Sequence, residues 1–310
     1  MSKKTHTEIE EVTVEVDEFG LPAKPTKQAA RMDQLRVLVI GHPGIGKTTL
    51  LTAGPDCILL ACEEGHKFIE GYKIIIDSWE DSEEDTDEDG NLHLSFMEAI
   101  KRLTKTKRFR FIVVDTLDAL VNMCKDHYLK KYRSEHVSDL GDYGRGYDLA
   151  QNTPIRRIMG AMLKTGRGVG YITHQKITTN TFESKGKKAS VQTKKECSLP
   201  SGIVSIVYPQ VDAIFHMEFG GTQEGNSWRD RIIRTEGSET LLAKNRGGKF
   251  PRAFIVPNEP KEAWEQLDGF LSNPANILLA EQEYHELYGG FDDLENVTEE
   301  DVDPNPEVAD

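Results

Sequence analysis

A glycine-rich segment at residues 41–49 constrains the fold more than any other part of the chain. It reads Gly41-His42-Pro43-Gly44-Ile45-Gly46-Lys47-Thr48-Thr49 and follows residues 35–40, an apolar and β-branched run typical of a buried parallel strand. The glycines allow consecutive backbone N–H groups to point towards an anion, and the next helix begins at that point. We therefore expect a nucleotide-binding loop in which Lys47 reaches the phosphates and Thr48 ligates Mg²⁺.

Charge is distributed unevenly along the 310 residues. The net charge is −14, yet fifteen acidic and no basic residues follow Lys261, and nine more acidic residues lie within 77–89. The rest of the chain therefore carries a net charge of +10. A basic body with acidic appendages is typical of nucleic-acid-binding proteins, because an acidic tail competes with phosphate for the basic surface. A solvated loop and a tail that only aid solubility would give the same pattern.

The composition also bears on the cellular compartment. No apolar stretch is long enough to cross a membrane, and the first residues lack the apolar core of a signal peptide. The four cysteines, at 57, 62, 124 and 197, form no C-x-x-C pair, which favours reduced and mostly buried thiols. We expect a cytoplasmic protein without a membrane partner.

Predicted strands and helices alternate as in βα units, which indicates an α/β fold. Strands are expected at 35–40, 57–61, 72–76, 110–114 and 169–173, and helices at 47–52, 92–103, 117–131 and 147–164. Short strands are expected next, at 204–208, 212–218, 230–234, 240–244 and 252–256, followed by helices at 262–271 and 276–287. The predicted organisation is a flexible arm (1–33), a core with a mainly parallel sheet flanked by helices and a β-rich C-terminal extension (34–257), C-terminal helices (258–288) and an acidic disordered tail (289–310).

Two predicted strands end in carboxylates that suit nucleotide chemistry. The strand at 110–114 leads into Asp115, which at the carboxyl edge of a parallel sheet would support Mg²⁺. Asp115 would equally serve as a cap for the helix at 117–131. The strand at 57–61 leads to Glu63 and Glu64, of which Glu63 is better placed to orient an attacking water. Two solvated loop glutamates are the alternative.

Cationic segments follow two other predicted elements. The strand at 169–173 ends in His174 and Gln175, which suit phosphate sensing, and a long polar loop is expected at 176–200. A second loop, at 128–147, interleaves aromatic and cationic residues as stacking platforms for single-stranded nucleic acid do. Either loop would otherwise be a mobile, solvated segment. The predicted DNA-binding residues are Lys130, Lys131, Arg133, Arg145, Lys176, Lys185, Lys187, Lys188, Lys194 and Lys195.

Lys244 and Arg246 lie two residues apart on the predicted strand edge, so alternation places both on one face. Such a cationic pair can stabilise phosphoryl transfer, and in oligomeric ATPases it comes from the neighbouring subunit.

The order of these parts resembles the RecA-like ATPase core. Three stretches are similar to phage-encoded RecA-like ATPases of single-strand annealing and recombination: Glu63-Glu-Gly-His-Lys-Phe-Ile with Trp79-Glu-Asp, Gly141-Asp-Tyr-Gly-Arg-Gly-Tyr, and Ala243-Lys-Asn-Arg. The resemblance spans roughly residues 34–257. The chain differs in having the acidic insert at 77–89 and no recognisable polymerisation or primase-binding domain.

This resemblance implies a DNA-stimulated ATPase that takes ATP and Mg²⁺ and acts in phage recombination, annealing or repair. Glu63 would activate water, Asp115 would support Mg²⁺, and Gln175 would couple the γ-phosphate to the DNA loop. Lys244 and Arg246 would act on the next subunit of a ring or short filament. A helicase, a helicase loader or an ATP-gated assembly factor is the alternative. The acidic tail would recruit a single-strand-binding or replication protein, in the host cytoplasm if the protein is phage-encoded.

Overall fold

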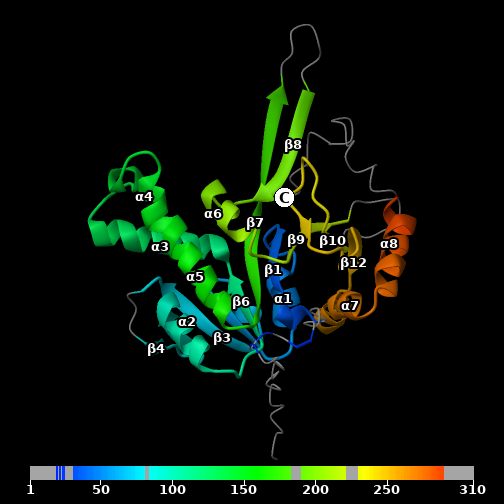
Figure 1. Ribbon diagram of the computed structural model, residues 1–310, viewed down its shortest axis with the longest axis horizontal. Coiled ribbons are helices and arrows are strands. Elements are labelled where there is room, and N and C mark those ends of the chain that lie inside the picture. The colour runs from blue at the N-terminus through cyan, green and yellow to red at the C-terminus, as the bar shows by residue number, and fades with distance from the viewer. Residues whose placement is uncertain are drawn as a thin grey trace, which may run out of the picture.

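The computed structural model describes residues 31–80, 84–182, 190–220 and 230–289, with positions 19, 21, 23 and 24 before them. The predicted arm (1–33) and acidic tail (289–310) therefore lie almost wholly outside the described residues. The described part is built around one twisted sheet with helices on both faces (Figure 1).

Seven strands form the parallel centre of this sheet, in the spatial order β9-β1-β7-β6-β2-β3-β5. Their bounds are β1 Arg36–Gly41, β2 Cys57–Ala61, β3 Tyr72–Ser78, β5 Leu92–Ser95, β6 Phe111–Asp115, β7 Gly168–Phe182 and β9 Ala213–Phe219. Antiparallel strands complete the sheet: β4 Asp85–Thr86, β8 Ser190–Cys197, β10 Arg231–Arg234, β11 Lys244–Asn245 and β12 Ala253–Val256. The expected β-rich extension is thus part of the same sheet, because β9 pairs directly with β1.

Helices cover the two faces of the sheet because successive strand residues point to opposite sides. One face packs against α2 Phe96–Lys105, α3 Leu117–Tyr132, α5 Thr153–Lys164 and α6 Ser201–Val207. The other packs against α1 Lys47–Thr52, α7 Pro260–Ser272 and α8 Ala275–Tyr288. The remaining helical turns are η1 Met32–Gln34, η2 His66–Phe68, η3 Val137–Leu140, α4 Arg145–Tyr147 and the π-helical η4 Asp148–Asn152.

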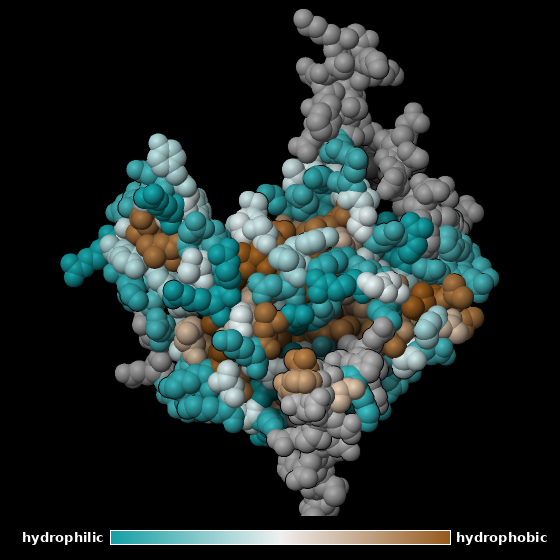
Figure 2. All heavy atoms as spheres, viewed as in Figure 1, coloured by the Kyte–Doolittle hydropathy of each residue, from teal (hydrophilic) through white to brown (hydrophobic). Residues whose placement is uncertain are grey.

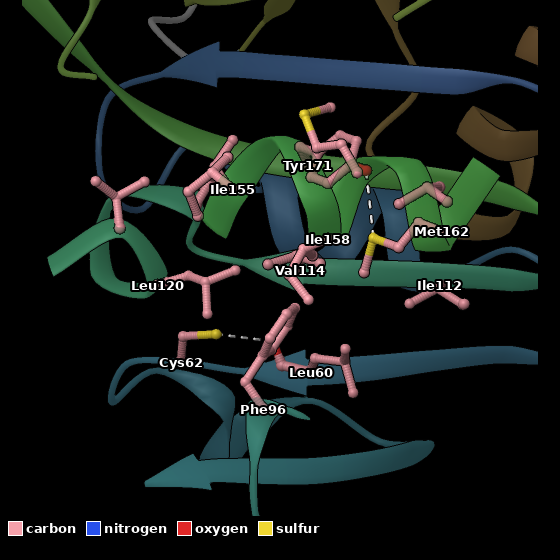
Figure 3. Packing of buried hydrophobic residues seen from close by; sticks show 14 of the residues in the cluster. Leu60, Cys62, Phe96, Ile112, Val114, Leu120, Ile155, Ile158, Met162 and Tyr171 are labelled. Atoms are coloured by element: carbon pink, nitrogen blue, oxygen red, sulfur yellow. Dashed lines mark hydrogen bonds between the residues drawn. The ribbon is translucent and has the colours of Figure 1, made fainter. Parts of the chain in front are cut away.

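The first of these cores is shown in Figure 3. Val114 of β6 and Tyr171 of β7 meet Phe96 of α2 and Ile158 and Met162 of α5, all at 5% exposure or less. The Tyr171 hydroxyl donates to the Met162 sulfur at 3.3 Å. Each large apolar side chain buried in this way contributes about 1.5–3 kcal/mol.

Three predicted elements differ from the structure. Residues 92–95 form a strand, and the helix begins only after Ser95, whose hydroxyl accepts from the N–H of Glu98. Residues 204–208, predicted as a strand, belong to helix α6. Of the strand predicted at 240–244, Lys244 belongs to the two-residue strand β11, and Leu241 forms only an isolated bridge with Lys195.

The predicted loop at 176–200 is also wrong as an irregular segment. β7 continues to Phe182 and pairs with β8 in an antiparallel hairpin that projects from the sheet at the top of Figure 1. We call these two strands beyond Gln175 the β7–β8 hairpin. Residues 183–189, between the strands, lie outside the described residues.

The mainly parallel sheet flanked by helices confirms the predicted α/β fold class. The face in Figure 2 is mostly hydrophilic, with hydrophobic side chains in small groups between the elements. Within the described residues, no helix combines the length and apolar character that a membrane crossing requires.

Candidate nucleotide site

The predicted nucleotide loop lies at the carboxyl edge of the parallel strands, between the end of β1 at Gly41 and the start of α1 at Lys47. Gly44 and Gly46 have φ angles of 77° and 97°, a region that favours glycine. A side chain at Gly41 would collide with β9, since a Cβ there would lie 2.6 Å from the Met217 carbonyl oxygen. The loop therefore needs its glycines.

The other members of the loop divide between solvent and core. His42 and Pro43 are exposed, whereas Ile45 is 1% exposed and packs into the core beneath α1. Thr49 is half-buried in the first turn of α1. Ile45 thus anchors a loop whose rim remains open to a ligand.

Lys47 folds back over the loop. Its Nζ donates to the carbonyl oxygens of Gly41 (2.9 Å) and His42 (2.8 Å), and the residue is 5% exposed. Burial lowers the pKa of Lys47, while the nearby carboxylates of Asp115 and Glu63 act in the opposite direction. A phosphate group offers this ammonium a stronger partner than the two carbonyls do.

Thr48 and Asp115 bring two oxygen ligands together. The Thr48 hydroxyl donates to Oδ2 of Asp115 at 2.7 Å. Burial raises the pKa of Asp115, and the bond from Thr48 opposes that shift. Hard oxygen donors of this kind, supplemented by water and phosphate oxygens, suit Mg²⁺. Thr48 and Asp115 therefore fit the predicted ion, which would neutralise phosphate charge when bound.

Glu63 is held in place and still open to water. It follows β2, and its Oε2 accepts a 2.9 Å hydrogen bond from the buried Thr116 hydroxyl. Thr116 also caps α3 by accepting from the N–H of Ala119. The Glu63 side chain remains 37% exposed. A fixed, solvent-accessible carboxylate is what the orientation of an attacking water requires.

His174 lies between two carboxylates. Its Nε2 is 3.8 Å from Oε1 of Glu63, and its Nδ1 is 3.8 Å from Oδ2 of Asp118. The backbone N–H of His174 donates to Asp118 at 3.1 Å, and the Ser198 hydroxyl donates to the other oxygen of that carboxylate. These contacts hold the middle of β7, at His174, beside the predicted catalytic residue Glu63.

Gln175 continues from this site into a buried polar chain. Its Oε1 lies 3.1 Å from Nε2 of His216, a fully buried residue of β9 whose pKa is lowered to about 4 by burial. The neutral ring can donate through Nε2. Two residues along β9, Glu218 pairs with Lys195 of β8 (2.8 Å) and with Arg234 of β10 (2.6 Å). Burial raises the pKa of Glu218, but the two cations outweigh it and the net shift is downward.

A model of the AAA domain family matches residues 33–247, more than half of the chain and all of the contacts above. The chain belongs to this AAA domain family. One similar solved structure is the flagellar accessory protein FlaH from Methanocaldococcus jannaschii, with 14% identity over 74% of this chain and 87% of that one, and a TM-score of 0.35. Another is a KaiC-like protein from Pyrococcus horikoshii OT3, with 11% identity over 74% and 88%, and a TM-score of 0.35. No curated protein matches the chain.

Membership of this family makes the chain an ATPase-type domain in general, and the loop at 41–49 is its candidate nucleotide site. In this candidate site Lys47 would meet the phosphates, Thr48 and Asp115 would hold the ion, and Glu63 would orient the attacking water. A water oriented by a carboxylate beside a neutralised phosphate can attack the terminal phosphorus.

Lys244 and Arg246 lie at the opposite edge of the AAA domain's sheet. Nζ of Lys244 donates to two carbonyl oxygens and Arg246 bonds to Asp212 (3.3 Å), all in the turn at residues 208–212. This turn precedes β9, which is parallel to β1, so it lies at the amino edge, away from the loop. Contact between these cations and a nucleotide would therefore involve a second copy of the chain.

Four of the cations predicted to bind DNA lie on or beside the helices α3 and α4 of the AAA domain. Lys130 and Lys131 lie in the last turn of α3, Arg133 caps that helix with φ of 54°, and Arg145 begins α4. All four are exposed. We call residues 128–147 the α3–α4 arm, and Figure 1 shows it projecting to the left of the sheet.

The predicted DNA-binding lysines of the β7–β8 hairpin differ in exposure and in ion pairing. Lys176 is exposed on β7, whereas Lys194 lies 3.4 Å from Glu196 and Lys195 is paired with Glu218. Lys195 is thus already ion-paired within the chain, although its side chain is 42% exposed. The other predicted cations of this segment lie outside the described residues: Lys185, Lys187 and Lys188.

Sequence reasoning missed the residues that support the catalytic groups. Thr116 directly follows Asp115, and its position at a strand–helix junction is a usable signal for a capping hydroxyl. His216 and Glu218 alternate on one predicted strand, which indicates a shared face but not a partner. The sequence places Asp118 in the first turn of a predicted helix, but nothing in it indicates a contact between Asp118 and His174.

Proposed function

We propose that this AAA domain protein hydrolyses ATP and binds single-stranded DNA in phage recombination, annealing or repair. The observation that supports the proposal best is the course of β7, which runs without interruption from Gln175 into the β7–β8 hairpin. His174 lies beside Glu63 of the candidate nucleotide site, and Gln175 follows it on the strand that continues into the hairpin, so one strand would link the nucleotide to the hairpin.

The α3–α4 arm offers a second contact for DNA. Tyr132, Tyr143 and Tyr147 are 48%, 103% and 54% exposed. Exposed tyrosines beside Lys131 and Arg145 suit base stacking combined with backbone contact, which tolerates any sequence. The arm and the hairpin would bind one strand together.

Assembly into a ring or short filament belongs to the same proposal. The amino-edge position of Lys244 and Arg246 would bring them to the ATP of an adjacent copy in a head-to-tail arrangement. The acidic tail, by its charge alone, would recruit a single-strand-binding or replication protein or restrain DNA binding.

The decisive experiment measures ATP turnover with and without single-stranded DNA across a salt series. We expect DNA to raise turnover, and the logarithm of DNA affinity to fall with the logarithm of salt by about 0.7 per phosphate contact. Turnover that is indifferent to DNA would reject this proposal and favour an ATP-gated assembly factor. Unwinding of a duplex would favour a helicase over an annealing protein.

A pair of double variants locates the DNA contact. Lys130→Ala with Lys131→Ala removes two exposed lysines from the arm, and Lys101→Ala with Lys105→Ala removes two exposed lysines from α2. We expect only the arm variant to weaken DNA binding and to reduce the salt slope. Equal effects of the two variants would indicate general charge attraction rather than a site.

A further inference from the structure

One cation beside the nucleotide loop belongs to neither the catalytic groups nor the amino-edge pair. A Cβ placed on Gly46 would lie 2.6 Å from Nη1 of Arg231, so the guanidinium lies directly over the last glycine of the loop. Arg231 comes from β10, two strands away from β1 in the sheet. The loop is therefore approached by a cation from its own chain.

The topology explains how Arg231 reaches this position. β10 is antiparallel to β9, so its first residue pairs with Phe219, at the edge where the parallel strands end. Alternation places Arg231 on the same face as Ile233, and Ile233 shares a core with Ile45 of the loop. Arg231 thus continues that face beyond the core and above the loop.

The charge of Arg231 is poorly compensated. Nη2 donates to the Pro257 carbonyl oxygen at 2.7 Å, while the buried Nε has no hydrogen-bond partner among the described residues. No carboxylate of the described residues forms an ion pair with it, and burial lowers its pKa. The adjacent Asp230 bonds instead to the Tyr288 hydroxyl at 2.7 Å. A partly buried guanidinium that has no counter-ion within the described part of the chain favours an anionic ligand.

The position of the catalytic groups indicates which part of the nucleotide meets Arg231. Glu63 follows β2, Asp115 ends β6, and Gln175 lies within β7. These three strands all lie on one side of β1. The terminal phosphate must face those groups for hydrolysis. β9 and β10 lie on the other side of β1, so the loop presents the phosphates nearer the ribose towards Arg231.

We propose that Arg231 binds, within the same chain, the diphosphate portion that ATP and ADP share. It acts as an affinity residue of the nucleotide site and takes no part in attack on the terminal phosphate. The inference rests on ATP binding alone and is independent of the DNA-binding proposal.

The test compares Arg231→Ala with Arg252→Ala in nucleotide titrations without DNA. Arg252 is an exposed arginine just before the neighbouring strand β12, ion-paired with Glu236, and serves as the matched control. We expect Arg231→Ala to lower the binding affinity for Mg-ADP and that for a non-hydrolysable ATP analogue by the same factor, roughly 10- to 100-fold. Turnover at saturating ATP should change less than twofold. Arg252→Ala should leave both affinities unchanged.

Two results would overturn the proposal. One is unchanged ADP affinity, and the other is a loss confined to the ATP analogue or to turnover, which would place Arg231 at the terminal phosphate.

Thermal unfolding separates ligand binding from a structural role. Without nucleotide, Arg231→Ala should melt no lower than the parent protein, because it removes a partly buried charge that no acidic group of the described residues pairs with, while the stabilisation by ADP should shrink. If Arg231→Ala lowers the melting temperature of the free protein, but ADP still raises that temperature as much as in the parent, then Arg231 has a structural role and does not bind ADP. Should the alanine variant fail to fold, Arg231→Gln keeps part of the aliphatic stem and a polar end without the charge, and it is expected to give the same ADP defect.

Discussion

Nε2 of His216 lies 3.1 Å from Oε1 of Gln175, and this contact joins the middle of β7 to the chain of charged residues on β9. Glu218, on the same face of β9, holds Lys195 at the base of the β7–β8 hairpin. A change in the position of Gln175 therefore has a direct physical route to both strands of the hairpin.

The buried His216 predicts a specific dependence of stability on pH. Its pKa is about 4 in the folded chain, against an ordinary value near 6.5, so between these values the unfolded state binds more protons. Stability from this residue is present above pH 6.5 and is lost as the pH falls towards 4, by roughly 3 kcal/mol in total. The groups that face it are Gln175, Glu218, Lys195 and Arg234.

Urea unfolding at pH 7.5 and pH 5 checks this expectation. His216→Gln keeps a donor for Gln175 but cannot titrate, so its stability should fall less between the two pH values than that of the parent. An equal fall in both proteins would assign the pH dependence to other groups.

Glu63 and Thr116 should differ in their effect on turnover. Glu63→Gln keeps the shape but removes the charge that orients water, and we expect turnover to fall by roughly 10²- to 10⁴-fold with ATP affinity retained. Thr116→Val removes only the hydroxyl that holds Glu63, so its turnover should fall less than that of Glu63→Gln. Steady-state kinetics with a nucleotide titration measures both. Full turnover in Glu63→Gln would move the catalytic role to another carboxylate.

Arg246 and Lys47 provide a test of action between copies. Arg246→Ala should lose turnover while keeping ATP affinity, and Lys47→Ala should lose hydrolysis and nucleotide-dependent DNA binding. If Arg246 acts on an adjacent copy, a mixture of the two variants contains some interfaces with a normal loop and a normal arginine. Its turnover should exceed the mean of the separate variants. If the Arg246→Ala variant by itself turns over ATP at the wild-type rate, Arg246 does not act on the ATP of an adjacent copy.

Deletion of residues 292–310 tests whether the acidic tail competes with DNA. Removing nine acidic residues should strengthen DNA binding at low salt, with a smaller gain at high salt because screening weakens the competition. Fluorescence anisotropy with labelled single-stranded DNA reports the affinity. Unchanged affinity at low salt means that the tail serves another purpose, such as a partner site.

Local patterns were sufficient to predict which residues would come together at the candidate nucleotide site. Lys47 and Thr48 follow from glycine spacing, and Asp115 and Glu63 follow from apolar strands that end in carboxylates, since parallel strands end at one edge. Arg231 could not be found in this way. A single arginine on a short strand has no motif, and its place over Gly46 depends on how β10 returns antiparallel to β9.

The mistaken elements have similar causes. Residues 204–208 carry β-branched side chains, but Ile203, Ile206 and Val207 fall on one helical face and are buried there, so packing decides against strand propensity. The hairpin was taken for a loop because its lysines and threonines give no apolar alternation. Its pairing is set by backbone hydrogen bonds between β7 and β8 rather than by a buried face.

Because β7 is continuous, a small rotation of the strand near Gln175 produces a larger displacement at its far end. Seven residues separate Gln175 from Phe182, a span of about 23 Å at roughly 3.3 Å per residue. If the strand turns as a rigid body by about 5° at Gln175, its far end moves by about 2 Å. A displacement too small to disturb the packing around the ATPase site would thus become, at the end of the hairpin, comparable to the length of a hydrogen bond.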